Sequence, residues 1–198
     1  MSDIYLGTLT AVISVIGTLT AIWFKYYLDR KKRGSDCVVK RAINDIDEMT
    51  YLLDEIKDEI KADRVSIMSF HNGGEYYSGK SMQKISCSYE VVSPGISRSI
   101  LDLQNIPVAA CMPTLSTLIR NNEFHHDDVN LDYPESFCKF KLSEHGVKST
   151  YQYVIRDLKK NVIGVLRVDF VTRKVKLSPE DHVSLRHLAI KLPGYLAK

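Results

Sequence analysis

The segment GEYYSGKS, Gly74 to Ser81, matches the phosphate-binding pattern G-x-x-x-x-G-K-[ST] at every position. In that pattern the glycines let backbone N–H groups surround phosphate oxygens, the Lys contacts the outer phosphates, and the Ser hydroxyl binds Mg²⁺. The chemistry requires a helix that begins at the Lys-Ser pair and directs its positive end at the anion. The residues that follow Ser81 therefore decide whether this match indicates a nucleotide triphosphate site.

Those residues predict a strand. Apolar and polar side chains alternate from Lys84 to Val91, with the β-branched and aromatic residues that strands favour. The stretch RVSIMSF, Arg64 to Phe70, predicts another strand, and HNGG after it predicts a turn. We therefore expect a hairpin connection between the two strands, and a nucleotide-binding enzyme becomes the least favoured alternative.

The remaining reactive side chains do not form a catalytic pattern. His125, His126, Asp127 and Asp128 are metal-binding residue types, but adjacent side chains in a loop diverge, so we expect a solvated loop. Cys138 and His145 are two helical turns apart. The sequence therefore predicts no catalytic residue, no metal and no cofactor.

The cysteines and the charge narrow the class of protein. Cys37, Cys87, Cys111 and Cys138 include no C-x-x-C pair, and we expect unpaired thiols in a reducing compartment. A net charge of +3 is too small to indicate nucleic acid binding.

The N-terminal segment predicts a permanent single-pass anchor in the cell (inner) membrane. The run from Ile4 to Phe24 contains no charged residue, and as a helix it is long enough to cross the hydrocarbon core of a bilayer. The alternative is a buried core helix. A basic flank follows, formed by Arg30, Lys31, Lys32 and Arg33. The positive-inside rule then places the rest of the chain in the cytoplasm.

Two patterns predict a homo-oligomer. Small residues recur down one face of the span, where they let helix backbones approach closely: Gly7, Thr10, Ser14, Gly17 or Thr18, and Ala21. A second stripe, which we call the seam, repeats at steps of three and four: Val39, Ala42, Ile46, Met49, Leu53, Ile56 and Ile60. The seam either pairs with its copy in another chain or packs on the domain of its own chain.

The sequence divides into an anchor with its basic flank (1–33), a helical stalk or first domain helix (34–62) and a domain (63–198). Within the domain, PGISRSILDLQ predicts a short helix, HHDDVNLDYPE a polar loop, and ESFCKFKLSEHG a helix that ends at Gly146. NIPVAACMPTLSTLIRNNEF is ambiguous, because two prolines interrupt it. STYQYVIRD and VIGVLRVDF predict a hairpin in which Asp169 only faces solvent, and Ser178 caps a last helix. These elements indicate an α+β fold with an antiparallel sheet.

The stretches EHGVKSTYQYVIRDLKKNVIGVLRVDF and LSPEDHVSLRHLA resemble the C-terminal half of a GAF domain, and the resemblance extends over Ile46 to Leu192. It implies a GAF-like sheet flanked by helices. It also implies a small-ligand pocket between the sheet and the segment from Ile106 to Phe124, where it would face Phe70, Tyr89 and Tyr153, and His71 could also line it. The family's bilin-attachment and cyclic-nucleotide motifs are absent, so the ligand cannot be named.

Two classes of function follow from this organisation. The first is a non-catalytic, membrane-anchored GAF-like module that acts through a small ligand or a protein partner. The second is lysis, because the architecture resembles that of holins of large tailed phages, which carry a soluble GAF/PAS-like domain on one span. Those holins place the domain in the periplasm, whereas the basic flank here predicts the cytoplasm.

Overall fold

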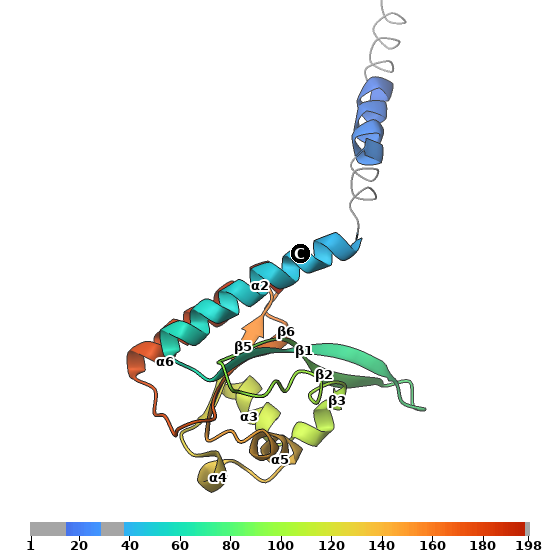
Figure 1. Ribbon diagram of the computed structural model, residues 1–198. Coiled ribbons are helices and arrows are strands. Elements are labelled where there is room, and N and C mark those ends of the chain that lie inside the picture. The colour runs from blue at the N-terminus through green and yellow to red at the C-terminus, as the bar shows by residue number, and fades with distance from the viewer. Residues whose placement is uncertain (1–14, 29–37, 197–198) are drawn as a thin grey trace, which may run out of the picture. The chain divides into compact units, whose positions relative to one another are not determined.

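The structure is a computed structural model that describes residues 15–28 and 38–196. The chain divides into two compact units, Met1–Asp45 and Ile46–Lys198. Residues 4–14 of the predicted span, the basic flank Arg30–Arg33 and Cys37 lie outside the described residues. The second unit holds the folded domain (Figure 1).

A six-stranded antiparallel sheet forms the centre of this domain, with the strand order β3-β2-β1-β6-β5-β4. The strands are β1 (Arg64–Glu75), β2 (Ser81–Val92), β3 (Ile106–Pro107), β4 (Glu123–His126), β5 (Ser149–Arg156) and β6 (Val162–Phe170). The four longest strands form two hairpins, β1–β2 and β5–β6, which meet where β1 pairs with β6. An α+β fold with an antiparallel sheet is thereby confirmed.

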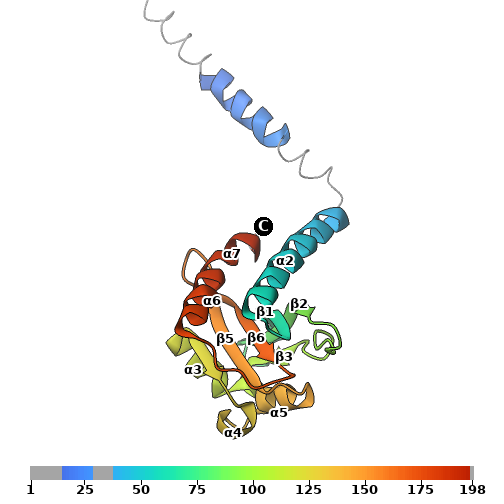
Figure 2. The same cartoon turned by 60° about the vertical axis from the view of Figure 1, so that its left-hand side comes forward.

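Helices cover both faces of the sheet, as Figures 1 and 2 show. On one face lie α2 (Val38–Ile60), α6 (Pro179–Lys191) and the short α7 (Pro193–Leu196); on the other lie η1 (Val108–Cys111), α3 (Thr114–Asn121), α4 (Val129–Asp132) and α5 (Phe137–Glu144). Each face has its own apolar core. Strands β5 and β6 are buried on both sides along most of their length, as central strands of a three-layer arrangement must be.

The seam of α2 divides into a buried and an exposed part. Met49, Leu53 and Ile56 are at most 1% exposed and pack in the core over the sheet. Val39 and Ile46 are 64% and 49% exposed. The C-terminal half of the seam therefore packs on the domain of its own chain, which is one of the two alternatives that the spacing left open.

GEYYSGKS joins two strands, as its flanking periodicity predicts. The Tyr76 N–H donates to the Lys80 carbonyl (2.8 Å) and the Gly79 N–H donates to the Tyr76 carbonyl (2.8 Å), which closes a tight turn. Gly79 has φ +75°, a conformation that glycine adopts without steric cost. Strand β2 begins at Ser81, so no helix begins at the Lys-Ser pair of this loop.

Several local predictions are confirmed. The β5–β6 hairpin forms, and α5 ends at Glu144 with His145 as its cap. Ser178 caps α6 in a reciprocal capping box with Asp181.

Others are wrong. His71 to Gly74 continue β1 instead of forming a turn. Residues 94–104 form turns and bends, with no helix. The predicted polar loop at His125–Glu135 contains the end of β4 and helix α4. Asp169 does not face solvent, since it is fully buried.

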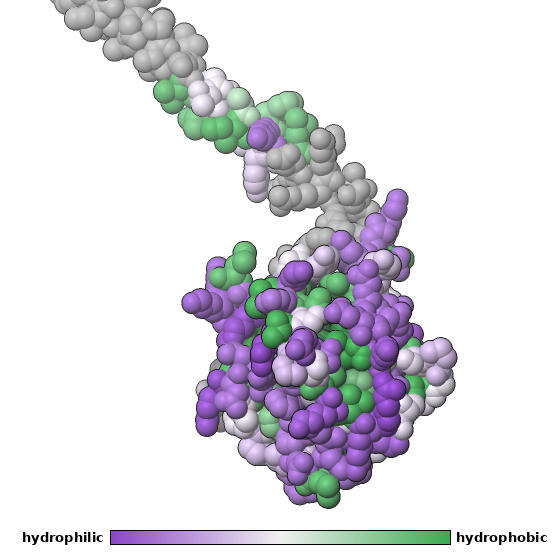
Figure 3. All heavy atoms as spheres, turned by 90° about the vertical axis from the view of Figure 1, so that its left-hand side faces the viewer, coloured by the Kyte–Doolittle hydropathy of each residue, from purple (hydrophilic) through white to green (hydrophobic). Residues whose placement is uncertain are grey.

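In the first unit, residues 15–28 form a helix whose side chains are all exposed. Its large apolar residues include Ile22, Trp23 and Phe24, and Figure 3 shows a mainly hydrophobic surface along this segment. Among the residues that the structure describes, no helix has both the length and the apolar character needed to cross a membrane.

Because Leu53 is fully buried and Val39 is not, the two positions of one seam should respond differently to truncation. We expect Leu53→Ala to lower the free energy of unfolding by about 2–5 kcal/mol, through lost burial and the cavity left behind. Val39→Ala, the matched control, should change it by less than about 0.5 kcal/mol. Both free energies of unfolding can be measured by urea titration monitored by near-ultraviolet circular dichroism of the tyrosines. Equal effects of the two substitutions would contradict the packing described for α2.

Candidate functional site

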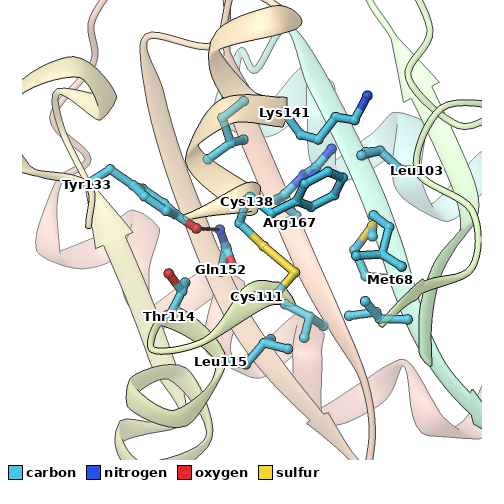
Figure 4. Close-up of a pocket in the computed structure, with 15 residues that line it drawn as sticks. Met68, Leu103, Cys111, Thr114, Leu115, Tyr133, Cys138, Lys141, Gln152 and Arg167 are labelled. Carbon is cyan, nitrogen blue, oxygen red and sulfur yellow. Dashed lines mark hydrogen bonds between the residues drawn. A yellow bond between two sulfur atoms is a disulfide. The ribbon is translucent and has the colours of Figure 1, made fainter. Parts of the chain in front are cut away.

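A pocket lies between the sheet and the helices of the α3–α5 face (Figure 4). Its volume is about 50 Å³. Most of its lining is apolar and comes from β1, β2, β3, α3, α5, β6 and the loop before β3: Met68, Ile85, Leu103, Ile106, Leu115, Phe137, Leu142 and Val165. A cavity needs roughly 10–15 Å³ to hold one water molecule, so this pocket accommodates a few waters or a small organic molecule.

One end of the pocket is polar. Gln152 on β5 and Arg167 on β6 are direct cross-strand neighbours, so their side chains leave the same face of the sheet. The Gln152 Nε2 donates to the Tyr133 hydroxyl at 3.5 Å, and the Thr114 hydroxyl lies on the same side of the pocket (Figure 4). Thr114 Oγ1 is buried and makes no hydrogen bond of regular geometry in the described part of the chain, although it is close enough to the Tyr133 hydroxyl to lower the pKa of that group.

Behind this polar end, four charged side chains from β1, β2 and β6 form a buried ion network. Arg64 Nε lies 3.3 Å from Glu90 Oε1, and Arg64 Nη1 lies 3.5 Å from Asp169 Oδ2. Arg167 Nε lies 3.1 Å from the same Asp169 oxygen. Two positive and two negative charges thus balance one another, which burial of charge requires.

The carboxylates of the network are well satisfied. Glu90 accepts hydrogen bonds from the Ser99 N–H (2.9 Å), the Ser99 hydroxyl (2.6 Å) and the Ile100 N–H (3.2 Å). Asp169 accepts one from the Thr150 hydroxyl at 2.8 Å. The network therefore fixes the loop that follows β2 as well as three strands.

The arginines are less well satisfied. Although Arg167 Nε is close to Asp169, its N–H is not aligned for a hydrogen bond. The Arg167 guanidinium makes no hydrogen bond within residues 15–28 and 38–196. The residue is only 8% exposed, so water does not surround it. The outer amines of Arg167, which lines the pocket, are therefore open to a further acceptor.

Unsatisfied polar atoms concentrate on this face of the sheet. Five buried side-chain atoms in the described residues lack a hydrogen-bond partner: Arg64 Nε, Ser66 Oγ, Thr114 Oγ1, His145 Nε2 and Arg167 Nε. An unpartnered buried polar group costs about 1–3 kcal/mol, so groups of this kind indicate bound water or a ligand.

Burial and charge set the protonation of groups near the pocket. Burial lowers the pKa of His145, and the Arg64 guanidinium lowers it further, while Asp102 opposes both. Burial raises the pKa of the Cys87 thiol to about 12. Cys87 is therefore a protonated thiol at neutral pH and a poor nucleophile.

Two pocket cysteines form a disulfide. Cys111 at the end of η1 and Cys138 in α5 are bonded, which links two walls of the pocket (Figure 4). The expectation of unpaired thiols is therefore wrong for these two residues and confirmed for Cys87. Sequence spacing did not show the pair because 27 residues separate the partners, and only the fold brings them together.

The structure does not bring the four predicted pocket residues together. Phe70 packs at the edge of the α3–α5 core, and His71 Nε2 makes a hydrogen bond with the Ser86 hydroxyl (2.8 Å). Tyr89 and Tyr153 pack in the core on the opposite face of the sheet, where the Tyr153 hydroxyl contacts His182 Nδ1 at 2.7 Å. None of the four is among the residues that line the pocket.

The displacement of Tyr89 has a specific cause. A bulge lies between the pairs Ile67–Tyr89 and Met68–Cys87, so Cys87 and Tyr89 face opposite cores although they are two residues apart.

The sequence analysis did not predict the polar residues of the pocket. The available signal was an Arg and an Asp within the apolar strand VLRVDF, since charges in a strand buried on both sides need partners.

The side chains of His125 to Asp128 diverge, as expected. His125 lies against Tyr151 with ring centroids 5.9 Å apart, Asp127 accepts from the Tyr151 hydroxyl, and Asp128 caps α4. No group of three or more potential metal ligands occurs in the described residues.

Comparison with solved structures shows the GAF fold. The GAF domain of PixJ from Thermosynechococcus elongatus, in its blue-light absorbing form, superposes with a TM-score of 0.62 at 13% identity, over 82% of this chain and 89% of that one. A far-red cyanobacteriochrome photoreceptor gives 0.60 at 17% identity, over 86% and 97%. The GAF-domain region of a Geobacter sulfurreducens protein gives 0.57 at 15% identity, over 81% and 97%.

The similarity is structural only. No protein-family model matches the sequence. No curated protein matches it either.

The lowered histidine pKa values predict a pH dependence of stability. His126, His145 and His182 all have a pKa below the ordinary 6.5, mainly because they are buried. The unfolded chain therefore binds more protons than the folded one just below pH 6.5, and the free energy of unfolding should fall as the pH falls from about 6.5 to 5. Asp63 and Glu123 also have a lowered pKa, and most of their contribution is lost as the pH falls below their ordinary values of 3.8 and 4.5.

Urea unfolding at several pH values measures this slope. His145→Gln should flatten it, and the exposed His187→Gln should leave it unchanged. Stability that does not change over this range would contradict the burial of these rings.

Proposed function

We propose that the chain is a non-catalytic, membrane-anchored GAF-like module that responds to a small ligand bound in the pocket between the sheet and α3–α5. The observation that carries the proposal is Arg167, a buried cation that lines a mainly apolar pocket and whose guanidinium makes no hydrogen bond in the described residues. Natural ligand sites combine an apolar lining with a few polar groups that fix orientation, and this pocket has that composition.

The size of the pocket limits the ligand. Sites for drug-sized ligands measure roughly 300–1,000 Å³, whereas this pocket measures about 50 Å³. Two of the structurally similar proteins are photoreceptors, but a chromophore of that kind exceeds the space here. We therefore propose a ligand of a few heavy atoms, and signalling through contact with a protein partner.

The absence of catalysis is part of the proposal. Cys87 is a buried thiol with a raised pKa, and Cys111 and Cys138 are bonded to each other. The phosphate-binding pattern lies in a hairpin turn, which cannot provide the helix N-terminus that nucleotide binding needs. We propose no nucleic acid partner, given the net charge of +3.

The anchor and its orientation are proposals from the sequence. The uncharged run from Ile4 to Phe24 and the basic flank Arg30–Arg33 support a single span with a cytoplasmic domain. The apolar, exposed helix at residues 15–28 suits contact with the lipid bilayer.

Self-association is also a proposal. The exposed half of α2 carries Val39, Ile43 and Ile46 on one stripe, which pairing with a second copy would bury. Sedimentation of the full chain in detergent that shows only monomer would contradict this.

The disulfide favours a second candidate function. Disulfides persist in oxidising compartments such as the bacterial periplasm and are rare in the cytosol. A periplasmic domain on one membrane span is the arrangement of the phage holins that the architecture resembles. Under this alternative the chain assembles into membrane lesions, and a regulator bound to the domain sets their timing.

Pocket binding can be tested on the full chain in neutral detergent. We expect compounds of four to about eight heavy atoms to include some that shift the Met68 methyl signal in NMR spectra. Leu115→Phe, which fills the pocket, should weaken such binding about tenfold or more, because ligand and ring compete for the same volume. Ile119→Phe, a partly exposed position on the same helix, is the control. A response that survives Leu115→Phe would place the ligand elsewhere.

The side of the membrane on which the domain lies distinguishes the two candidate functions. A reporter that is active only in the periplasm, fused after Lys198, should be silent if the domain is cytoplasmic, because the basic flank retains it there. A cytoplasmic fluorescent reporter at the same position should then be active. The reverse pattern, with Cys111 and Cys138 labelled by maleimide only after reduction, would exclude the cytoplasmic module and support the lysis protein.

A further inference from the structure

The charged groups that line the pocket have one sign. Lys141 and Arg167 are the charged residues among those lining it, and no Asp or Glu lines it. The neutral polar groups at its polar end are Thr114, Tyr133 and Gln152, which all have a hydrogen to donate. These three groups also carry acceptor oxygens, whereas the two cations can only donate, so the cations give the site its excess of donors. A ligand rich in acceptor oxygens would satisfy them.

The two cations differ in availability. Lys141 Nζ is bonded to Glu144 at 2.7 Å and lies 5.9 and 5.8 Å from the ring centres of Phe137 and Phe140. Within the described residues Arg167 forms one ion pair, with Asp169, which also contacts Arg64 and Thr150. Arg167 is thus the cation with open hydrogen-bonding capacity inside the pocket.

We propose that the ligand is a small monocarboxylate with a short apolar tail, whose carboxylate binds the outer amines of Arg167. The planar guanidinium matches a carboxylate with two parallel hydrogen bonds. The Thr114 hydroxyl, which lies beside the Tyr133 hydroxyl, supplies a further donor. The tail lies against Met68, Leu115 and Val165.

The charge and size of the site favour a monoanion. The four charges of the ion network already balance, so each negative charge that a ligand adds is costly to bury. A monoanion that accepts hydrogen bonds from Arg167 is therefore favoured over a phosphate dianion. The volume of about 50 Å³ favours the shortest members of this class, and butyrate is the longest that we test. This inference rests on the proposed function, since it names the ligand class of the same pocket.

Three probes of equal size and different charge test the inference: butyrate, butyramide and butylamine. With the full chain in neutral detergent and ¹³C-methyl methionine labels, we expect saturable butyrate binding at the Met68 signal. Butyramide should bind about 10- to 100-fold more weakly, because it lacks the charge-assisted pair. Butylamine should not bind.

A second readout depends on the charge of the bound probe. The arginine charges contribute to the low pKa of His145. A carboxylate on Arg167 offsets part of that charge, so butyrate should move the NMR titration of His145 to higher pH. Butyramide should not.

Substitutions at Arg167 and Thr114 test whether these residues bind the carboxylate. Arg167→Gln and Arg167→Lys should each weaken butyrate binding about tenfold or more, since both remove the planar fork. Thr114→Val, a change of one buried hydroxyl, should weaken it about 3- to 10-fold. The Thr114 and Lys variants keep the test decisive if Arg167→Gln does not fold.

Butyramide binding as tightly as butyrate, or butyrate binding that is unchanged in Arg167→Lys and Thr114→Val, would overturn the carboxylate inference and leave a small-ligand module intact. If neither these probes nor any compound of the wider set shifts Met68, the proposed function itself fails.

Discussion

The ion network of Arg64, Glu90, Arg167 and Asp169 is the constraint on which the α3–α5 face depends. Removing charges from water is costly, and their attraction compensates only when geometry and further hydrogen bonds are good. The network meets this condition through hydrogen bonds with backbone groups of the loop that follows β2. Glu90 binds the backbone of Ser99, and Arg64 Nη2 donates to the Ser97 carbonyl at 2.8 Å.

The same constraint explains why the pocket has a polar end at all. β6 places Val165, Arg167 and Asp169 on one face, so the strand passes from the apolar cavity to the ion network within five residues. Asp169 is shared among three donors and does not fully satisfy Arg167. The network therefore stabilises the sheet and leaves one guanidinium partly unpaired, which is the condition for recognising an acceptor in the cavity.

Patterns that depend on neighbouring residues were predictable from sequence. The alternation in STYQYVIRD and VIGVLRVDF, the turn between them, and the cap at Ser178 specify their elements locally. The segment after Pro94 was not predictable in this way. Its composition suits a helix, but its Ser99 and Ile100 N–H groups bind Glu90, so tertiary contacts determine its conformation.

The pocket residues show the same limit. Strand period two predicts which residues share a face only where the register is regular, and the bulge beside Met68 reverses the face of Tyr89. Strand β4 forms by pairing with β5, so the residues around His125 give little local sign of it. A charged pair within a buried strand was the one local feature that pointed to the site.

Compartment and pocket are linked through the disulfide. The basic flank at Arg30–Arg33 favours the cytoplasm, where thiols are kept reduced, whereas the Cys111–Cys138 bond favours an oxidising compartment. In the periplasm, η1 and α5 are joined covalently and the pocket keeps a fixed width between them. In the cytoplasm, only packing in the α3–α5 core holds these two walls, and a ligand could separate them. Under the proposed anchoring, the orientation of the span would therefore determine how far this pocket can adapt to a ligand.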